Sequence, residues 1–183
     1  MKQTILFVLL LMLFNCHRSS SDDDTTIPVD QLPATTQTGA NTAGCLVNGK
    51  VLLPRGQKPQ NGPVLAAFYQ FIDGGYHFGL GIEDYTNSKT VAIGSHNITL
   101  EQGKTYSLAE NLNDDSAVNM YANYWDYKTT FYSTSDIVTG EIKITRLDTS
   151  KFIISGTFWF DAVNANGEKI EVREGRFDLH YAP

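Results

Sequence analysis

The side chain with the most definite chemistry in this chain is the thiol of Cys16, which directly follows the apolar run 5–14 and Asn15. That run is too short to cross the roughly 30 Å hydrocarbon core of a bilayer, and Lys2 precedes it, so residues 1–15 have the composition of a signal peptide. Residues 13–16 resemble a lipobox, in which the cysteine sulfur receives diacylglycerol and the new amino group is acylated, for example with palmitate. We therefore expect a lipoprotein signal peptide and a lipid anchor on Cys16.

An ordinary secretory signal that is cleaved near residues 19–21 is the alternative, but the abrupt change from apolar to polar residues at position 15 favours Cys16. The stretch 16–43 is polar, acidic and interrupted by prolines, which predicts a solvated tether. Asp22, Asp23 and Asp24 resemble the export signal by which Bacteroidota lipoproteins reach the outer face of the outer membrane. They also fit an ordinary linker. The first interpretation predicts an outer-membrane protein that is lipid-anchored at the cell surface.

Aromatic side chains are crowded between residues 121 and 132, where they could stack on sugars or line a small apolar pocket. Strand alternation would place Tyr121, Trp125, Tyr127 and Phe131 on one face, and Tyr124 and Tyr132 on the other. Most of these rings must also pack in the core. The candidate ligand-binding residues are Tyr121, Tyr124, Trp125 and Tyr127, together with Trp159.

Trp159 lies in the most regular alternating segment, 151–163. Its neighbours Phe158 and Phe160 share the face expected to be core, so alternation directs the indole to the opposite face. Either the tether or another segment covers the ring, or the ring is an exposed platform for a sugar or a partner protein. The last expected strand follows the same logic, with residues 177, 179 and 181 inward and residues 176, 178 and 180 outward.

No set of residues predicts catalysis. The sequence lacks a Gly-x-Ser-x-Gly elbow, a Cys-x-x-Cys pair and a phosphate-binding glycine loop, and its histidines are scattered singly. We expect no catalytic residue, no metal and no cofactor. Once lipid occupies Cys16, Cys45 is the only cysteine left, and we expect it to be a buried core residue. Gly79, Gly81 and Gly94 are interpreted as isolated strand or bulge glycines.

The charge excludes one class of partner. The formal net charge is −6, and removal of residues 1–15, with one lysine and no acid, makes it −7. The chain has no basic run or stripe, so we expect no nucleic-acid partner.

Beyond residue 43 the hydrophobic residues alternate with a period of two, which predicts strands and almost no helix. One antiparallel domain, 44–183, follows the signal peptide 1–15 and the tether 16–43, and it is long enough to enclose a sizeable core. An all-β barrel or sandwich fits this pattern, and a lipocalin-like barrel is preferred. The expected strands after residue 50 are 51–53, 64–72, 76–82, 91–93, 98–100, 106–108, 120–127, 129–133, 140–147, 152–163, 169–172 and 176–181.

Two stretches resemble the ends of a Bacteroidota lipoprotein family of unknown function. The opening stretch reads TQTGANTAGCLVNGKV (36–51), and the closing one reads SGTFWF (155–160) followed by GRFD (175–178). The resemblance implies a secreted all-β domain and no particular activity. Asn48 and Gly49 form a tight turn in this interpretation, and residues 38–44 are the ordered end of the tether, docked beside that turn.

The sequence thus predicts a surface-exposed lipoprotein whose non-catalytic β domain binds a small molecule, a glycan or a protein partner. The alternative is a structural or assembly component of an outer-membrane complex, which would contact an outer-membrane protein.

Overall fold

Antiparallel strands are the main secondary structure of the protein, whose computed structural model describes residues 28–58, 62–112, 114, 117–126 and 130–183. Cys16, the three aspartates 22–24 and Tyr127 lie outside these residues. Within them the chain forms eleven strands and a single 3-10 helix, η1 (Pro28–Gln31), so the all-β prediction is confirmed. The strands are β1 (Thr42–Val47), β2 (Lys50–Leu52), β3 (Leu65–Ile72), β4 (Gly75–Asp84), β5 (Lys89–His96), β6 (Thr105–Leu108), β7 (Asn119–Asp126), β8 (Thr130–Ser133), β9 (Gly140–Asp148), β10 (Ile153–Val163) and β11 (Lys169–His180).

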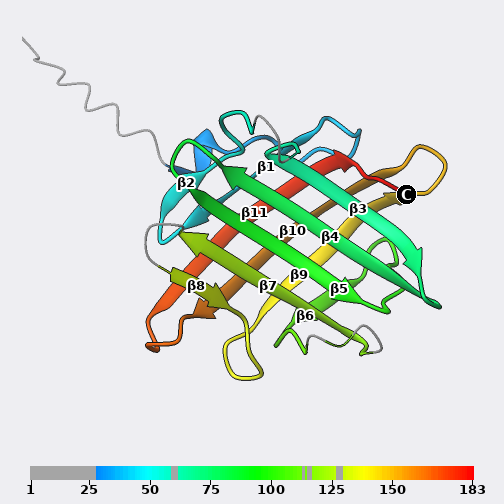
Figure 1. Cartoon of the computed structure of the whole chain (residues 1–183). Coiled ribbons are helices and arrows are strands. Elements are labelled where there is room, and N and C mark those ends of the chain that lie inside the picture. The colour runs from blue at the N-terminus through cyan, green and yellow to red at the C-terminus, as the bar shows by residue number, and fades with distance from the viewer. Residues whose placement is uncertain (1–27, 59–61, 113, 115–116, 127–129) are drawn as a thin grey trace, which may run out of the picture.

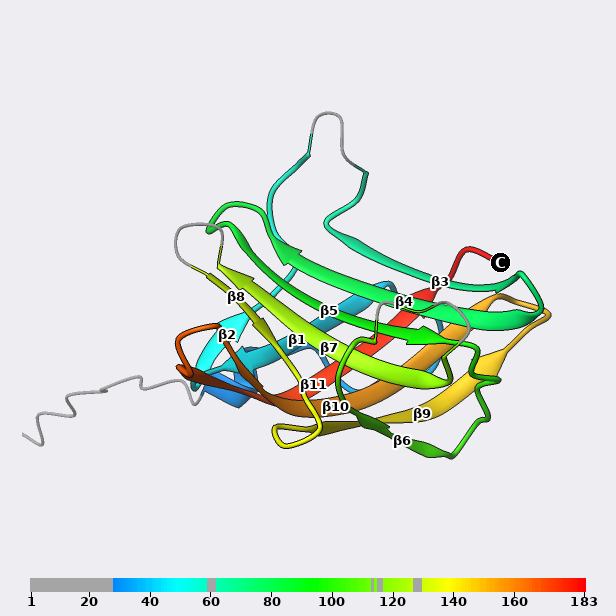
Figure 2. The same ribbon diagram turned by 60° about the horizontal axis from the view of Figure 1, so that its bottom comes forward.

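The strands belong to one sheet that curls into a half-barrel of two facing layers (Figures 1 and 2). The sheet order is β2-β1-β11-β10-β8-β7-β5-β4-β3, and β9 joins β10 to β6. In Figure 1 the strands of the β3-β4-β5-β7 layer cross those of the β11-β10-β9 layer. At the far edge, a single bridge between Phe68 and Ala182 brings β3 beside the C-terminal residues. Closure is therefore partial, which places the fold between the expected barrel and the expected sandwich.

The core lies between the two layers, because alternate residues of every long strand point inward. On β10, Ile154, Phe158, Phe160 and Ala162 are buried, as the alternation predicted. Cys45 of β1 is also fully buried, and burial raises the pKa of its thiol to about 12. At neutral pH this group is a thiol and not the nucleophilic thiolate, which agrees with a core role.

Two of the expected strand assignments are wrong: one expected strand is absent, and two others form a single strand. Residues 98–100 form no strand; Leu100 is instead held by a hydrogen bond from its backbone N–H to the Tyr69 hydroxyl (2.9 Å). Segments 169–172 and 176–181 belong to the single strand β11, which has a bulge opposite Phe158 and Phe160. Glu174 in that bulge has a φ of 55°. The extra residue shifts the alternation of inward and outward side chains, so the sequence of this one strand looks like that of two strands.

The Asn48-Gly49 turn is confirmed, with φ values of 48° and 73° at its two residues. The ordered end of the tether, however, docks elsewhere than expected. Residues 36–40 wrap around Asp178, which pairs with Thr42 at the opposite end of β1 from the turn. The folded region therefore begins within the stretch 16–43 that composition assigns to the tether.

Asp178 was expected to face outward into solvent, but it is only 2 % exposed because the tether covers it. One carboxylate oxygen accepts hydrogen bonds from the Thr36 hydroxyl (2.6 Å) and from the backbone N–H groups of Thr38 (2.9 Å) and Ala40 (3.1 Å). The other accepts from the Gly39 N–H (2.7 Å) and the Ser155 hydroxyl (2.7 Å). Burial opposes ionisation, but these hydrogen bonds outweigh it and hold the pKa of Asp178 far below its usual range.

We predict that Asp178→Asn lowers the free energy of unfolding by about 3 kcal/mol, because an amide presents a donor where N–H groups need an acceptor.

The lowered pKa of Asp178 also determines how the stability of the protein depends on pH. Stability from the ionised carboxylate is fully present above the unfolded pKa of about 3.9 and is lost as pH falls toward the lower folded-state pKa. Denaturant unfolding at several pH values should show a shallower acid loss in Asp178→Asn than in the wild type. The exposed Asp136→Asn is the control, and equal acid slopes for all three proteins would contradict the prediction.

Candidate ligand-binding site

The outer face of the β3-β4-β5-β7-β8 layer carries small side chains in its middle and aromatic ones around them. Strand pairing places Ala66, Gly81, Ala92 and Asn123 in one row across four strands. These four residues form the floor of a groove of about 700 Å³, which we call the trough. A solvated sheet face normally carries polar residues, so an apolar floor marks this face as unusual.

One wall of the trough is built by two rings that lie over glycines. The neighbouring row contains Phe68, Gly79, Gly94 and Tyr121. A Cβ at Gly79 would overlap the Phe68 ring, and a Cβ at Gly94 would overlap the Tyr121 ring, so both glycines are required for the rings to lie flat. By contrast, no atom lies within 4 Å of a Cβ built at Gly81. The floor is therefore open at Gly81 while the wall beside it is filled.

The opposite wall is formed by Trp125 and Phe131, a cross-strand pair whose ring centroids are 5.1 Å apart. Trp125 is four residues beyond Tyr121 on β7, which separates the two walls by about 14 Å between Cα atoms. The rings on the two sides occupy part of this distance. The space left between the walls is wide enough for one flat group or one extended chain.

Asn123 lies on the floor between these walls and is only 6 % exposed. Its Oδ1 has no hydrogen-bond partner among the residues that the structure describes. A buried amide oxygen without a partner costs about 1–3 kcal/mol, a cost that a ligand donor would remove. The trough thus combines an apolar surface with one unused acceptor.

The candidate aromatic residues from the sequence divide between the two faces as alternation predicts. Tyr121 and Trp125 line the trough with Phe131. Tyr124 points to the other side, where it is buried and packs near Tyr132 (ring centroids 5.8 Å apart). Burial, with the charge of Asp126 as a smaller contribution, raises the pKa of Tyr124 to about 12. Tyr127 lies outside the described residues.

Sequence reasoning missed the β3, β4 and β5 residues of the trough. Gly79 and Gly81 alternate on β4, so they share one face, and Ala92 and Gly94 share the same face of β5. The available signal was this paired spacing of small residues on consecutive strands. Interpreted one by one, the glycines conveyed nothing about a common surface.

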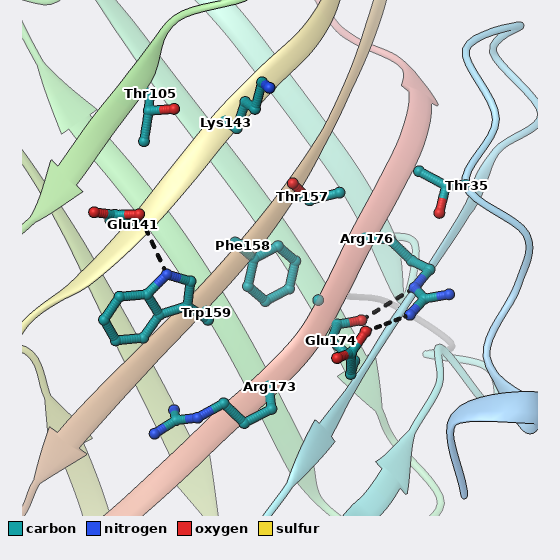
Figure 3. Close-up of a pocket in the computed structure, with 11 residues that line it drawn as sticks. Thr35, Thr105, Glu141, Lys143, Thr157, Phe158, Trp159, Arg173, Glu174 and Arg176 are labelled. Atoms are coloured by element: carbon teal, nitrogen blue, oxygen red, sulfur yellow. Dashed lines mark hydrogen bonds and ion pairs between the residues drawn. The ribbon is translucent and has the colours of Figure 1, made fainter. Parts of the chain in front are cut away.

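Trp159 lies on the outer face of the other layer, in a second, smaller pocket of about 480 Å³ (Figure 3). The indole is 39 % exposed, so the ring is not buried under the tether; Thr35 of the tether lines the same pocket on the opposite side from the ring. The indole N–H donates to the Glu141 carboxylate (3.4 Å), and the Arg173 guanidinium lies 5.5 Å from the ring centroid. Neither the tether nor another described segment therefore covers the indole.

Charged groups hold Arg173 in place beside Trp159. Arg173 forms an ion pair with Asp161 (2.6 Å), which also pairs with Lys169 (2.7 Å). Burial raises the pKa of Asp161, but its bonds to these two cations prevail and the net shift is downward. The Trp159 pocket therefore has charged side chains beside its exposed indole, and the described lining of the trough has none.

Metal-binding clusters and membrane-spanning helices are both absent from the segments that the structure describes. In these segments no three His, Cys, Asp or Glu side chains lie close enough together to hold a metal ion. Within the same segments no helix has the length and apolar character needed to cross a bilayer.

A family model for a domain of unknown function, DUF6252, matches residues 72–178. The chain belongs to the DUF6252 family. The match includes β4, β5, β7 and Trp159 and ends at Asp178, whereas Ala66 and Phe68 precede it. No curated protein and no solved structure matches this DUF6252 chain.

We predict that Trp159→Ala lowers the free energy of unfolding by only about 1 kcal/mol, mainly through the lost contact with Arg173. Phe160 is the matched control, because it is the next residue on β10 and is fully buried. Phe160→Ala should cost about 3–5 kcal/mol. Chemical denaturation of both variants gives the comparison, and a similar loss for the two would show that the indole contributes to the fold as a core residue.

Proposed function

We propose that this DUF6252 protein is a non-catalytic binding module, anchored by lipid to the outer membrane and exposed at the cell surface, and that the trough receives its ligand. The observation that carries the binding role is the unpaired Asn123 amide in an apolar floor. Stability alone favours neither feature, since an apolar groove open to water and a buried acceptor without a donor are both unfavourable. A ligand that covers the floor and donates to Asn123 would remove both costs.

The anchoring part of the proposal is supported by the apolar run that ends before Cys16 and by the acidic residues that follow it. In this proposal residues 16–27 link the lipidated cysteine to Pro28, the first residue that the structure describes. The resemblance of residues 36–51 and 155–178 to a Bacteroidota lipoprotein family supports the same localisation.

A second candidate function, as a structural or assembly component of an outer-membrane complex, is favoured by a different observation. The β3–β4 hairpin exposes Phe71 (64 %), Ile72 and Tyr76, and the exposed Val118 lines the same pocket as Phe71 and Tyr76. A contiguous apolar patch of this kind suits contact with an outer-membrane protein. If substitutions in this hairpin impair the function and substitutions in the trough do not, the second candidate is favoured.

Gly81→Val tests the trough. Position 81 does not have a positive φ and has room for a side chain, so the variant should fold normally while its isopropyl group fills the floor. Isothermal titration of a panel of apolar small molecules and neutral oligosaccharides should find at least one member that binds the wild type, and its affinity should fall at least tenfold in the variant. A loss of this size corresponds to about 1.4 kcal/mol. The control is Thr157→Val, which changes the outer face of β10. Equal binding by wild type and Gly81→Val would contradict a site in the trough.

Cys16→Ser tests the anchor. Thioether-linked lipid requires the sulfur, so the variant should move from the membrane fraction to the soluble fraction. Replacement of Asp22, Asp23 and Asp24 by alanine should instead leave the protein in the membrane fraction but protect it from protease added to intact cells. A Cys16→Ser protein that still sediments with membranes would refute lipid attachment, and unchanged proteolysis of the triple variant would refute the export signal.

A further inference from the structure

The polar and apolar groups of the trough are segregated along its floor. The floor runs from Asn123 on β7 through Ala92 and Gly81 to Ala66 on β3. Asn111 lines the trough as well, whereas Ala182 and Phe68 lie with Ala66 at the β3 end. Past Asn123 the floor offers a ligand only apolar side chains and glycines.

This segregation disfavours a sugar as the occupant. A pyranose ring carries hydroxyl groups around its whole edge, and those directed toward Phe68, Phe131 or Ala66 would meet no hydrogen-bonding side chain there. A hydroxyl that loses water without gaining a partner opposes binding. The Trp159 pocket shows the contrast, because Glu141, Lys143 and Arg173 surround its ring.

The dimensions and the charge restrict the ligand further. Three strand spacings separate Asn123 from Ala66, a distance of about 14 Å. Among the described residues that line the trough there is no lysine, arginine, aspartate or glutamate, so nothing there compensates a ligand charge. The unpaired Oδ1 of Asn123 accepts and therefore calls for a donor.

We propose that the trough binds a neutral amphipathic small molecule, with a flat or extended apolar body over Ala92, Gly81 and Ala66 and one hydroxyl or amide donor at the Asn123 end. This inference rests on the proposed function, because it names the ligand class of the same site. The body packs between the Phe68 and Tyr121 rings on one side and the Trp125 and Phe131 rings on the other. The donor group completes the hydrogen bonding of the amide.

The experiment uses 2-naphthol, which has a hydroxyl donor, 2-methoxynaphthalene, in which a methyl group replaces that proton, and maltotriose as a neutral glycan. The protein is the full chain with Cys16→Ser, so that no detergent competes for the apolar site. Isothermal titration should show 2-naphthol binding about tenfold more tightly than 2-methoxynaphthalene, the value of one hydrogen bond. Maltotriose should not bind in the trough. Gly81→Val should abolish binding of both naphthalene probes.

Asn123→Leu removes the acceptor and keeps the side-chain size. Because this amide oxygen has no partner to lose, the variant should unfold at no lower denaturant concentration than the parent. It should bind the two naphthalene probes equally. If the leucine variant does not fold, the ratio of the two affinities in the parent protein still tests the inference.

The outcomes separate the inference from the proposed function. Equal affinity for the two naphthalene probes in the parent, or binding of maltotriose that Gly81→Val abolishes, would overturn the amphipathic ligand while leaving a trough that binds. If none of the three probes binds, the amphipathic ligand is also overturned, and the broader comparison of wild type with Gly81→Val then decides whether the trough binds anything.

Discussion

One buried carboxylate joins the two ends of this fold. Asp178 lies near the end of the last strand, and the groups that hydrogen-bond to it come mainly from residues 36–40, ahead of the first strand. The two stretches that resemble a lipoprotein family, TQTGAN and GRFD, therefore meet at a single charge. Gly39 shows how tight the arrangement is, since its φ is +76° and a Cβ there would overlap the His180 ring. Asn41 adds a further bond by accepting the backbone N–H of His180 (3.0 Å). Pairing of β1 with β11 follows directly, because the loop and the strand partner are held side by side.

Local alternation predicted what lies within one strand and failed for what depends on several. The faces of β10 followed from Phe158, Trp159 and Phe160, and those of β7 from Tyr121 and Tyr124. Alternation could not show that Asp178 is buried, because the groups that cover it are more than 130 residues away in the chain. The bulge at Glu174 was equally hidden, since one extra residue looks like a break between strands. The trough required the register of β3, β4, β5 and β7, which no single segment contains. From the sequence, only the rings of Tyr121, Trp125 and Phe131 indicated this face.

The two outer faces of the sheet differ in chemistry although each carries exposed aromatic rings. In the trough the rings flank a floor of small residues, and the buried Oδ1 of Asn123 in that floor lacks a partner among the described residues. Around Trp159 the ring is already engaged by Glu141 and Arg173, and the ion pairs of Asp161 hold the arginine. Pre-existing contacts of this kind leave less for a ligand to gain. Because its acceptor is unpaired and its floor is open, a ligand would gain more new contacts in the trough than beside Trp159.

The attachment at Asp178 also decides how the domain would bear mechanical load. If lipid holds the chain at its N-terminal end, any pull from the membrane arrives along the tether, passes η1 and the buried Leu32, and then meets the hydrogen bonds around this carboxylate. The force then passes into β1, β11 and β10, which lie in the opposite layer from the trough. Strands β4, β5 and β7 are not in that direct line. A pull at the anchor would therefore leave the shape of the trough unchanged.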